Sequence, residues 1–160
     1  MADTFAGLQQ SAVLYHAAAG VLYSSANARW LEAQKNGSPP PADTSKFNEM
    51  VGGFAGSIVL HAFAVELVLK AVCVKRGVVY PKTHDLGKLF SLLSPTDQAT
   101  AESGWKQKHP GSAARLGEVL KSNADAFEEW RYQHEYTPTN IVSEELSLVF
   151  SEIYAISNAS

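Results

Sequence analysis

The longest apolar stretch of the chain, residues 51–74, most constrains what it can fold into. It is interrupted by His61, Glu66 and Lys70, and glycines thin its first half. Charged side chains inside a membrane are costly and rare. We therefore expect a central core helix, apolar on nearly every side, instead of a membrane span. The 160 residues, 46% of them apolar, are enough to build one ordinary core around it.

Apolar residues recur at helical spacing through most of the remaining sequence. The spacing predicts long helices at about residues 5–34, 46–75 and 113–135, shorter ones at 83–93 and 97–108, and a last helix from Ser143. Residues 78–80 form the best β-branched run, which is too short to anchor a sheet. The proline-rich residues 36–41 read as a loop between helices. The sequence thus predicts an all-α, up-and-down bundle of four to five main helices, one domain over residues 1–160.

Charge and cysteine content limit which ligands and which cellular compartment suit the protein. A formal net charge of -3 argues against nucleic-acid binding through bulk charge alone, although it allows a local basic patch. The single cysteine, Cys73, cannot form an internal disulfide, and it lies in an apolar helix where a packed thiol is expected. No charged segment followed by an apolar one opens the chain. These features favour the cytoplasm.

Two candidate catalytic residues lie near the end of the expected helix 113–135. At 100° per residue, Arg131 and His134 fall on the same stripe as Leu116 and Trp130. About 60° separates the two, so both side chains can reach one site. The alternative is structural, because near a helix end a long Arg side chain reaches solvent and a His meets terminal carbonyls. Both readings stay open.

Glu66 is a carboxylate within the most apolar helix. Burying it without a cation is expensive, so it needs a partner. Lys70, one turn later, offers one in the favourable order of acid before base. Arg131 offers another, because a guanidinium can hold a carboxylate with two hydrogen bonds inside a bundle. The sequence does not decide between them.

The segment around His84 follows the core helix. Thr83 is expected to cap a short helix with His84 in its first turn. Charges at helix ends are commonly just solvated. The same corner is nonetheless locally basic and could hold a phosphate or an RNA backbone. Its cations are Lys70, Lys75, Arg76, Lys82 and Lys88.

Several signatures of enzymes and metal sites are missing. The glycines at 52, 53 and 56 match neither a phosphate loop nor a dinucleotide fingerprint, and are better suited to loosening a helix start or bringing helices close together. The sequence has no nucleophile-elbow spacing, no paired cysteines and no His-Glu-x-x-His. Its five histidines are scattered. We therefore expect no metal site and no cofactor.

Three segments taken in order resemble the HEPN family (higher eukaryotes and prokaryotes nucleotide-binding). They are residues 64–71 (AVELVLKA), 82–89 (KTHDLGKL) and 130–135 (WRYQHE), and the likeness covers about residues 51–135. The resemblance implies a bundle of four or five helices, commonly a homodimer. It also implies a role in toxin–antitoxin, phage-defence or RNA-processing systems.

Many members of that family are metal-independent ribonucleases with an Arg-x4–6-His motif at a dimer interface. Here only two residues separate Arg131 from His134. The segment from Arg131 to Glu135 resembles members in which Arg and Glu are structural. We therefore favour a module, not membrane-bound, that binds a nucleotide, RNA or an antitoxin-like protein. The alternative is a ribonuclease with His134 as general acid/base and Arg131 stabilising the phosphorane. The candidate binding residues are Glu66, Lys70, Lys82, His84, Lys88 and Glu135.

Overall fold

The computed structural model describes residues 4–35, 37, 44–112, 114–124 and 143–159. These residues form helices and connecting turns, with no strand among them, so the predicted all-α class is confirmed. The helices are α1 (Phe5–Lys35), α2 (Ser45–Lys75), α3 (Leu86–Ser91), α4 (Pro95–Lys108), α5 (Leu116–Ser122) and α7 (Ser143–Asn158).

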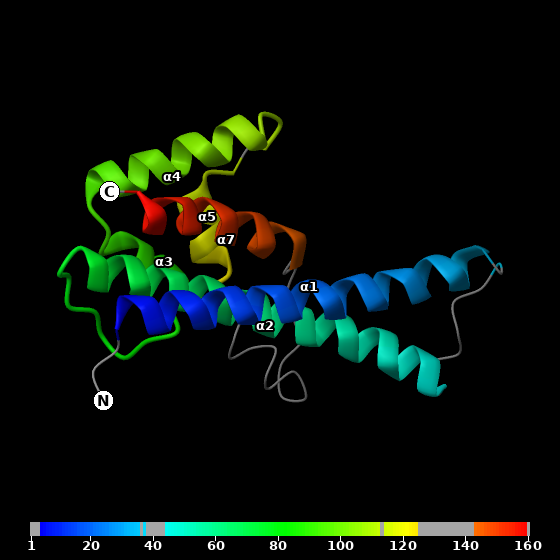
Figure 1. Ribbon diagram of the computed structural model, residues 1–160. Coiled ribbons are helices and arrows are strands. Elements are labelled where there is room, and N and C mark those ends of the chain that lie inside the picture. The colour runs from blue at the N-terminus through cyan, green and yellow to red at the C-terminus, as the bar shows by residue number, and fades with distance from the viewer. Residues whose placement is uncertain (1–3, 36, 38–43, 113, 125–142, 160) are drawn as a thin grey trace.

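Helices α1 and α2 pair as a long antiparallel hairpin, and the other helices gather over one half of it (Figure 1). Helix α7 lies against the hairpin, and α4 lies on the far side of α7 (Figure 1). The tip of the hairpin extends beyond this cluster. The beginning of α1 and the end of α7 meet at the opposite end, where the Gln9 side chain donates to Ser157 and Asn158.

Helix α2 is the central helix of the core, as the sequence predicts. Val65, Val68, Leu69 and Val72 are completely buried, and α7 and α3 pack against this half of the helix. By length and composition alone α2 could cross a membrane, but 67% of its most apolar window is buried inside the bundle. Burial among other helices explains its apolar character without a lipid environment.

Small residues set the close spacing of α1 and α2. Ala12, Ala19 and Ala26 recur every seven residues along the buried side of α1. Opposite Ala26 stands Gly53, where an added Cβ would lie 3.0 Å from the Ala26 Cβ. Cβ atoms in proteins rarely come this close. The prediction that a glycine here brings helices together is therefore confirmed for Gly53.

The starts of two short helices differ from the sequence prediction. Asp85, not Thr83, caps α3, because its side chain accepts the Lys88 backbone N–H at 2.8 Å. The hydroxyl of Thr83 instead accepts the backbone N–H of Asp85 at 3.1 Å. The next helix begins at Pro95, two residues before the predicted start, because proline suits the first turn and Ser94 caps it.

The prediction of one long helix over residues 113–135 is wrong. Helix α5 runs only from Leu116 to Ser122. At its end the Asn123 side chain donates to the Val119 carbonyl at 2.8 Å, and Ala124 turns back onto Lys121. The backbone N–H of Asn123 keeps its helical bond to the same Val119 carbonyl, so the helix ends at the turn made by Ala124. The remainder of the predicted helix, residues 125–135, lies outside the described residues.

Candidate functional site: a buried carboxylate between a lysine and a histidine

Glu66 lies at the centre of a three-residue polar cluster between α2 and the loop before α3. Its side chain is only 2% exposed. One carboxylate oxygen accepts a hydrogen bond from Lys70 Nζ at 2.6 Å, and the other lies 2.8 Å from His84 Nδ1. The carboxylate is therefore satisfied at both oxygens, as a buried charge must be.

Local hydrogen bonds in the loop place His84 against Glu66. The side chains of Thr83 and Asp85 both bind backbone N–H groups of their own segment. Between these two anchors, His84 points to α2. The side chain of His84 is 41% exposed, so the imidazole joins the buried carboxylate to the surface.

The contact through Nδ1 also fixes the orientation of the imidazole. A carboxylate can only accept, so Nδ1 carries the proton that points at Glu66. In the neutral ring Nε2 is then the basic nitrogen. Carboxylates hold histidines in this way in metal and proton-transfer sites. Here the same arrangement fixes the orientation of the His84 ring.

Lys70 is held by two groups. Besides its ion pair with Glu66, its Nζ lies 5.6 Å from the centre of the Tyr80 ring, which allows a cation–π contact. The structure thus pairs Glu66 with Lys70, one of the two partners that the sequence left open. Arg131, the other one, lies outside the described residues, so that pairing stays a prediction.

The basic corner predicted from the sequence is smaller than expected, because internal contacts occupy three of its five cations. Lys70 binds Glu66, and Lys75 donates to the carbonyls of Ser157 and Ala159 at the end of α7. Arg76 forms two hydrogen bonds with a carboxylate at the start of α4. The cations that remain exposed, with no ion pair to another described residue, are Lys82 and Lys88.

The partner of Arg76 is the buried carboxylate of Asp97. The guanidinium donates from Nε at 3.2 Å and from Nη2 at 3.0 Å, and the Ser94 hydroxyl adds a hydrogen bond of 2.8 Å. Burial acts to raise the pKa of Asp97, but these hydrogen bonds and the charge of Arg76 outweigh it and lower the pKa. The pair therefore ties α2 to α4 and is structural.

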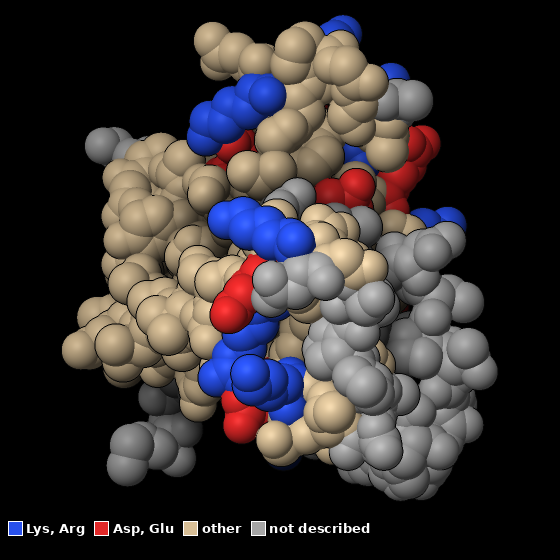
Figure 2. Space-filling model, turned by 90° about the vertical axis from the view of Figure 1, so that its right-hand side faces the viewer, with Lys and Arg blue, Asp and Glu red and all other residues tan. Residues whose placement is uncertain are grey.

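At the tip of the hairpin, charges of both signs lie among one another. Figure 2 looks onto this end and shows Lys and Arg side chains with Asp and Glu side chains among them. Arg29 of α1 pairs there with Glu49 of α2. Mixed charges of this kind favour solvation over anion binding. The corner at Lys82 and Lys88 is therefore the better candidate for a phosphate.

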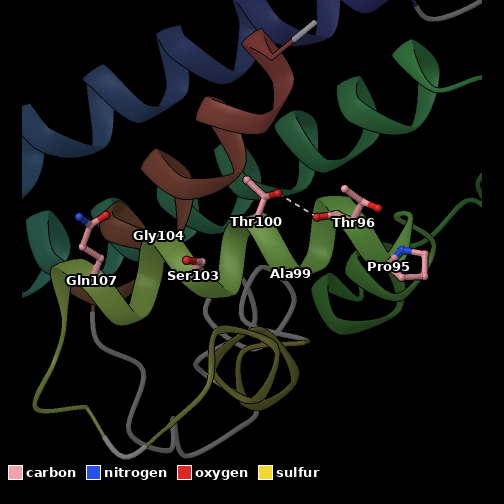
Figure 3. A pocket seen from close by; sticks show the side chains of 7 residues that line it. All are labelled: Pro95, Thr96, Ala99, Thr100, Ser103, Gly104 and Gln107. Carbon is pink, nitrogen blue, oxygen red and sulfur yellow. Dashed lines mark hydrogen bonds between the residues drawn. The ribbon is translucent and has the colours of Figure 1, made fainter.

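A shallow hollow runs along α4 and contains none of the predicted site residues. Short uncharged side chains dominate it, and the Thr100 hydroxyl donates to the Thr96 carbonyl at 2.9 Å (Figure 3). Such a lining offers neither a titratable group nor a cation. Its residues are Pro95, Thr96, Ala99, Thr100, Ser103, Gly104 and Gln107.

A second pocket contains two residues that sequence reasoning did not select, His16 and His61. Their ring centres lie 5.2 Å apart although 45 positions separate them in the chain, so no local motif reveals them. One signal was available: His16 shares the helical spacing of the buried Ala12 and Ala19, and His61 interrupts the core stretch. Arg131, His134 and Glu135, which were selected, lie outside the described residues.

The described residues thus form an all-helical domain in which a buried carboxylate is held by a lysine one turn later and a histidine in the following loop. The model of one family, described as HEPN domain, matches residues 43–158, which include all three segments of the resemblance. The chain belongs to the HEPN family. Comparisons with curated proteins and with solved structures find no match.

Proposed function

We propose that this chain is a non-catalytic HEPN module that binds RNA or a nucleotide through its phosphates. The observation that carries the proposal is the oriented His84, with the exposed Lys82 and Lys88 close by in sequence. Buried Glu66 fixes the imidazole, and two lysines with no ion pair to another described residue supply positive charge. A phosphate needs both hydrogen-bond donors and charge, and the ammonium groups of the lysines supply both. Nε2 of His84 adds a donor in the protonated form of the ring.

Charge reversal at the two lysines tests the proposal. In a fluorescence-anisotropy titration with labelled single-stranded RNA and labelled ATP, Lys82→Glu with Lys88→Glu should weaken binding at least about tenfold and lower the salt slope by about two. The control is Lys46→Glu with Lys106→Glu, which makes the same change in net charge at exposed positions elsewhere. The proposal is wrong if neither probe binds, or if both double variants lose binding equally.

A homodimer is part of this proposal. Helix α1 carries no Lys, Arg, Asp or Glu from residue 5 to residue 28, yet much of it faces solvent. Leu14 is 63% exposed and Val21 is 70% exposed. Interface cores are depleted of charge and contain such apolar side chains. These exposed apolar residues support the proposal that a second copy of the chain covers this face of α1.

The proposal also covers the cellular system in which the module acts and its protein partner. Family membership supports a cytoplasmic role in toxin–antitoxin, phage-defence or RNA-processing systems, with an antitoxin-like protein as a further partner. One domain over residues 1–160 would carry all of these contacts. Co-purification of the untagged chain with the product of a neighbouring gene tests the protein partner.

The ribonuclease with Arg131 and His134 remains the alternative. The short spacing of these residues changes the distance between the base and the scissile phosphate, and geometry comes before pKa in judging a general base. Metal-free RNA cleavage, lost in His134→Ala, would establish this alternative in place of binding alone.

A further inference from the structure

The outer face of α1 carries a second heptad pattern, opposite the one that packs on α2. The inner pattern is the buried row of Ala12, Ala19 and Ala26. At 100° per residue, the outer pattern lies about 180° from that row. Its positions alternate at spacings of three and four from residue 7 to residue 31, and every one of them is exposed. The first set of positions holds Gly7, Leu14, Val21 and Ala28, and the second set holds Gln10, Ala17, Ser24 and Leu31.

A pattern of this length is typical of a helix that pairs with another helix. Uncharged residues at alternating spacings of three and four, sustained over about three heptads, indicate a coiled-coil seam. From residue 7 to residue 31 the seam follows about 36 Å of helix. The positions beside the seam carry no Lys, Arg, Asp or Glu up to residue 28, whereas a solvated helix face is normally charged. The face therefore fits a packed helix better than solvent.

We propose that two α1 helices pair antiparallel through these outer faces, with a two-fold axis level with residue 19. The inference rests on the homodimer of the proposed function and adds its interface, its orientation and its register. In a two-fold dimer the same surface of each copy meets the other, so the pattern must be complementary to itself.

The sizes of the side chains favour the antiparallel orientation. In such a pair, residues of the first set face residues of the second set on the partner. One register uses all eight positions, and each of its layers combines a larger with a smaller side chain, as close packing of facing positions requires. The facing pairs are Gly7 with the partner's Leu31, Ala28 with the partner's Gln10, Ser24 with the partner's Leu14, and Ala17 with the partner's Val21.

A parallel pair stacks each residue on its own copy. Leu14 then meets the partner's Leu14 and Gly7 meets the partner's Gly7, so wide and narrow layers alternate. The charged end of α1 adds repulsion, because Glu32 lies beside the partner's Glu32. In the antiparallel register Glu32 lies level with the partner's Ala6, in the uncharged first part of the helix.

Packing inside each chain uses the same kind of surface. Helices α1 and α2 already run antiparallel, with Ala26 on one helix against Gly53 on the other. Small residues on that inner face let the two helices come close together. The outer face repeats small residues among larger ones, at Gly7, Ala17 and Ala28.

Disulfide cross-linking tests the orientation and the register together. Leu14→Cys and Ser24→Cys chains, one of them His-tagged, are mixed in reductant and then oxidised at tens of micromolar. We expect the mixed disulfide to form at least about tenfold faster than in a matched mixture of tagged and untagged Val79→Cys chains, because the dimer holds the two thiols at a high effective concentration. Val79 is 91% exposed in the loop after α2. Wild type is the blank, since its single cysteine, Cys73, is completely buried.

Each cysteine variant alone reports the opposite orientation. In the antiparallel register Leu14 and the partner's Leu14 stand ten residues apart along the axis, about 15 Å, which is beyond the reach of a disulfide. A parallel pair brings the same two positions together. Leu14→Cys oxidised alone should therefore cross-link no faster than the Val79→Cys control.

Two results would overturn the interface. One is rapid cross-linking of Leu14→Cys with itself, which shows a parallel pair. The other is a mixed disulfide that forms no faster than in the Val79→Cys control, which shows that a second copy does not cover this face. RNA anisotropy on the same reduced samples separates the two proposals. Retained RNA binding without the cross-link overturns the interface alone, and absence of RNA binding overturns the phosphate site whatever the cross-link shows.

Discussion

Glu66 and His84 lie 2.8 Å apart between carboxylate Oε2 and imidazole Nδ1, and join the central helix to the loop that precedes α3. Lys70 satisfies the other oxygen of the same carboxylate. The contact therefore links the most buried charge of the described bundle to the corner where we propose phosphate binding.

Loss of the Glu66 charge should destabilise the fold. Glu66→Gln keeps the shape but leaves the ammonium of Lys70 without its partner, and breaking a buried pair costs about 3 kcal/mol. Urea unfolding of Glu66→Gln and wild type measures the difference. The matched control is Glu49→Gln, whose exposed pair with Arg29 contributes less than about 1 kcal/mol. Equal effects at both positions would contradict the buried pair.

Two adjacent glycines of α2 should respond in opposite directions to the same change. A Cβ at Gly52 meets nothing within 4 Å, so Gly52→Ala should stabilise the helix by up to about 1 kcal/mol. At Gly53 the Cβ meets Ala26 across the hairpin, so Gly53→Ala should destabilise by about 1 kcal/mol or more. Thermal unfolding of both variants compares them. Stabilisation at both positions would show that the hairpin has room at Gly53.

Stability should fall as the pH decreases from about 6.5 toward 4. The pKa of His61 in the fold is about 4, below its ordinary value of 6.5, so the unfolded chain takes up the proton first. The resulting slope is at most about 1.4 kcal/mol per pH unit for one group. Urea unfolding at several pH values measures it. The slope should flatten in His61→Gln, and an unchanged slope in that variant would assign the effect to other groups.

The lowered pKa of Asp97 acts in a separate pH range. Its contribution is present above the ordinary carboxyl value of 3.8 and is lost only as the pH falls below it. Above about pH 5 the Asp97 titration therefore adds little to the slope assigned to His61.

The uncharged face of α1 should hold a homodimer together. Leu14→Lys and Val21→Lys place charge on that face, so each should convert the dimer to a monomer at protein concentrations of tens of micromolar. Sedimentation velocity measures the oligomeric state. Val79→Lys is the control, because Val79 is 91% exposed and lies in the loop after α2. A monomeric wild type would contradict the dimer.

The sequence predicts α1, α2 and the start of α7 well because their signals are local and repeated. The start of α1 at Phe5, the end of α2 at Lys75 and the start of α7 at Ser143 agree with the prediction. The helix cap at Asp85 was missed because Thr83 is also a favourable capping residue, and only the folded loop shows which backbone N–H each one binds. The end of α5 was missed because the chain leaves the helix through a turn in which Ala124 N–H bonds to the Lys121 carbonyl, and no glycine or proline marks this position.

The contacts at the sites also fall into two kinds. Some follow from the spacing of residues on one helix, and others depend on tertiary packing. Lys70 as a partner of Glu66 follows from a spacing of four residues on one helix. His84 as its second partner depends on how the loop returns to α2, and the pairing of His16 with His61 depends on the packing of α1 against α2. The sequence marks the helix positions of His16 and His61 but does not show that either contact forms. The occupation of Lys75 and Arg76 by internal partners is equally a product of tertiary structure.

Incubation of labelled RNA with the purified chain in EDTA distinguishes a binding module from a ribonuclease when binding and cleavage are read from the same sample. We expect a shifted band or raised anisotropy, with the RNA recovered at full length from both wild type and His134→Ala. Fragments produced by wild type, and absent with a folded His134→Ala, would contradict a non-catalytic module and establish the ribonuclease.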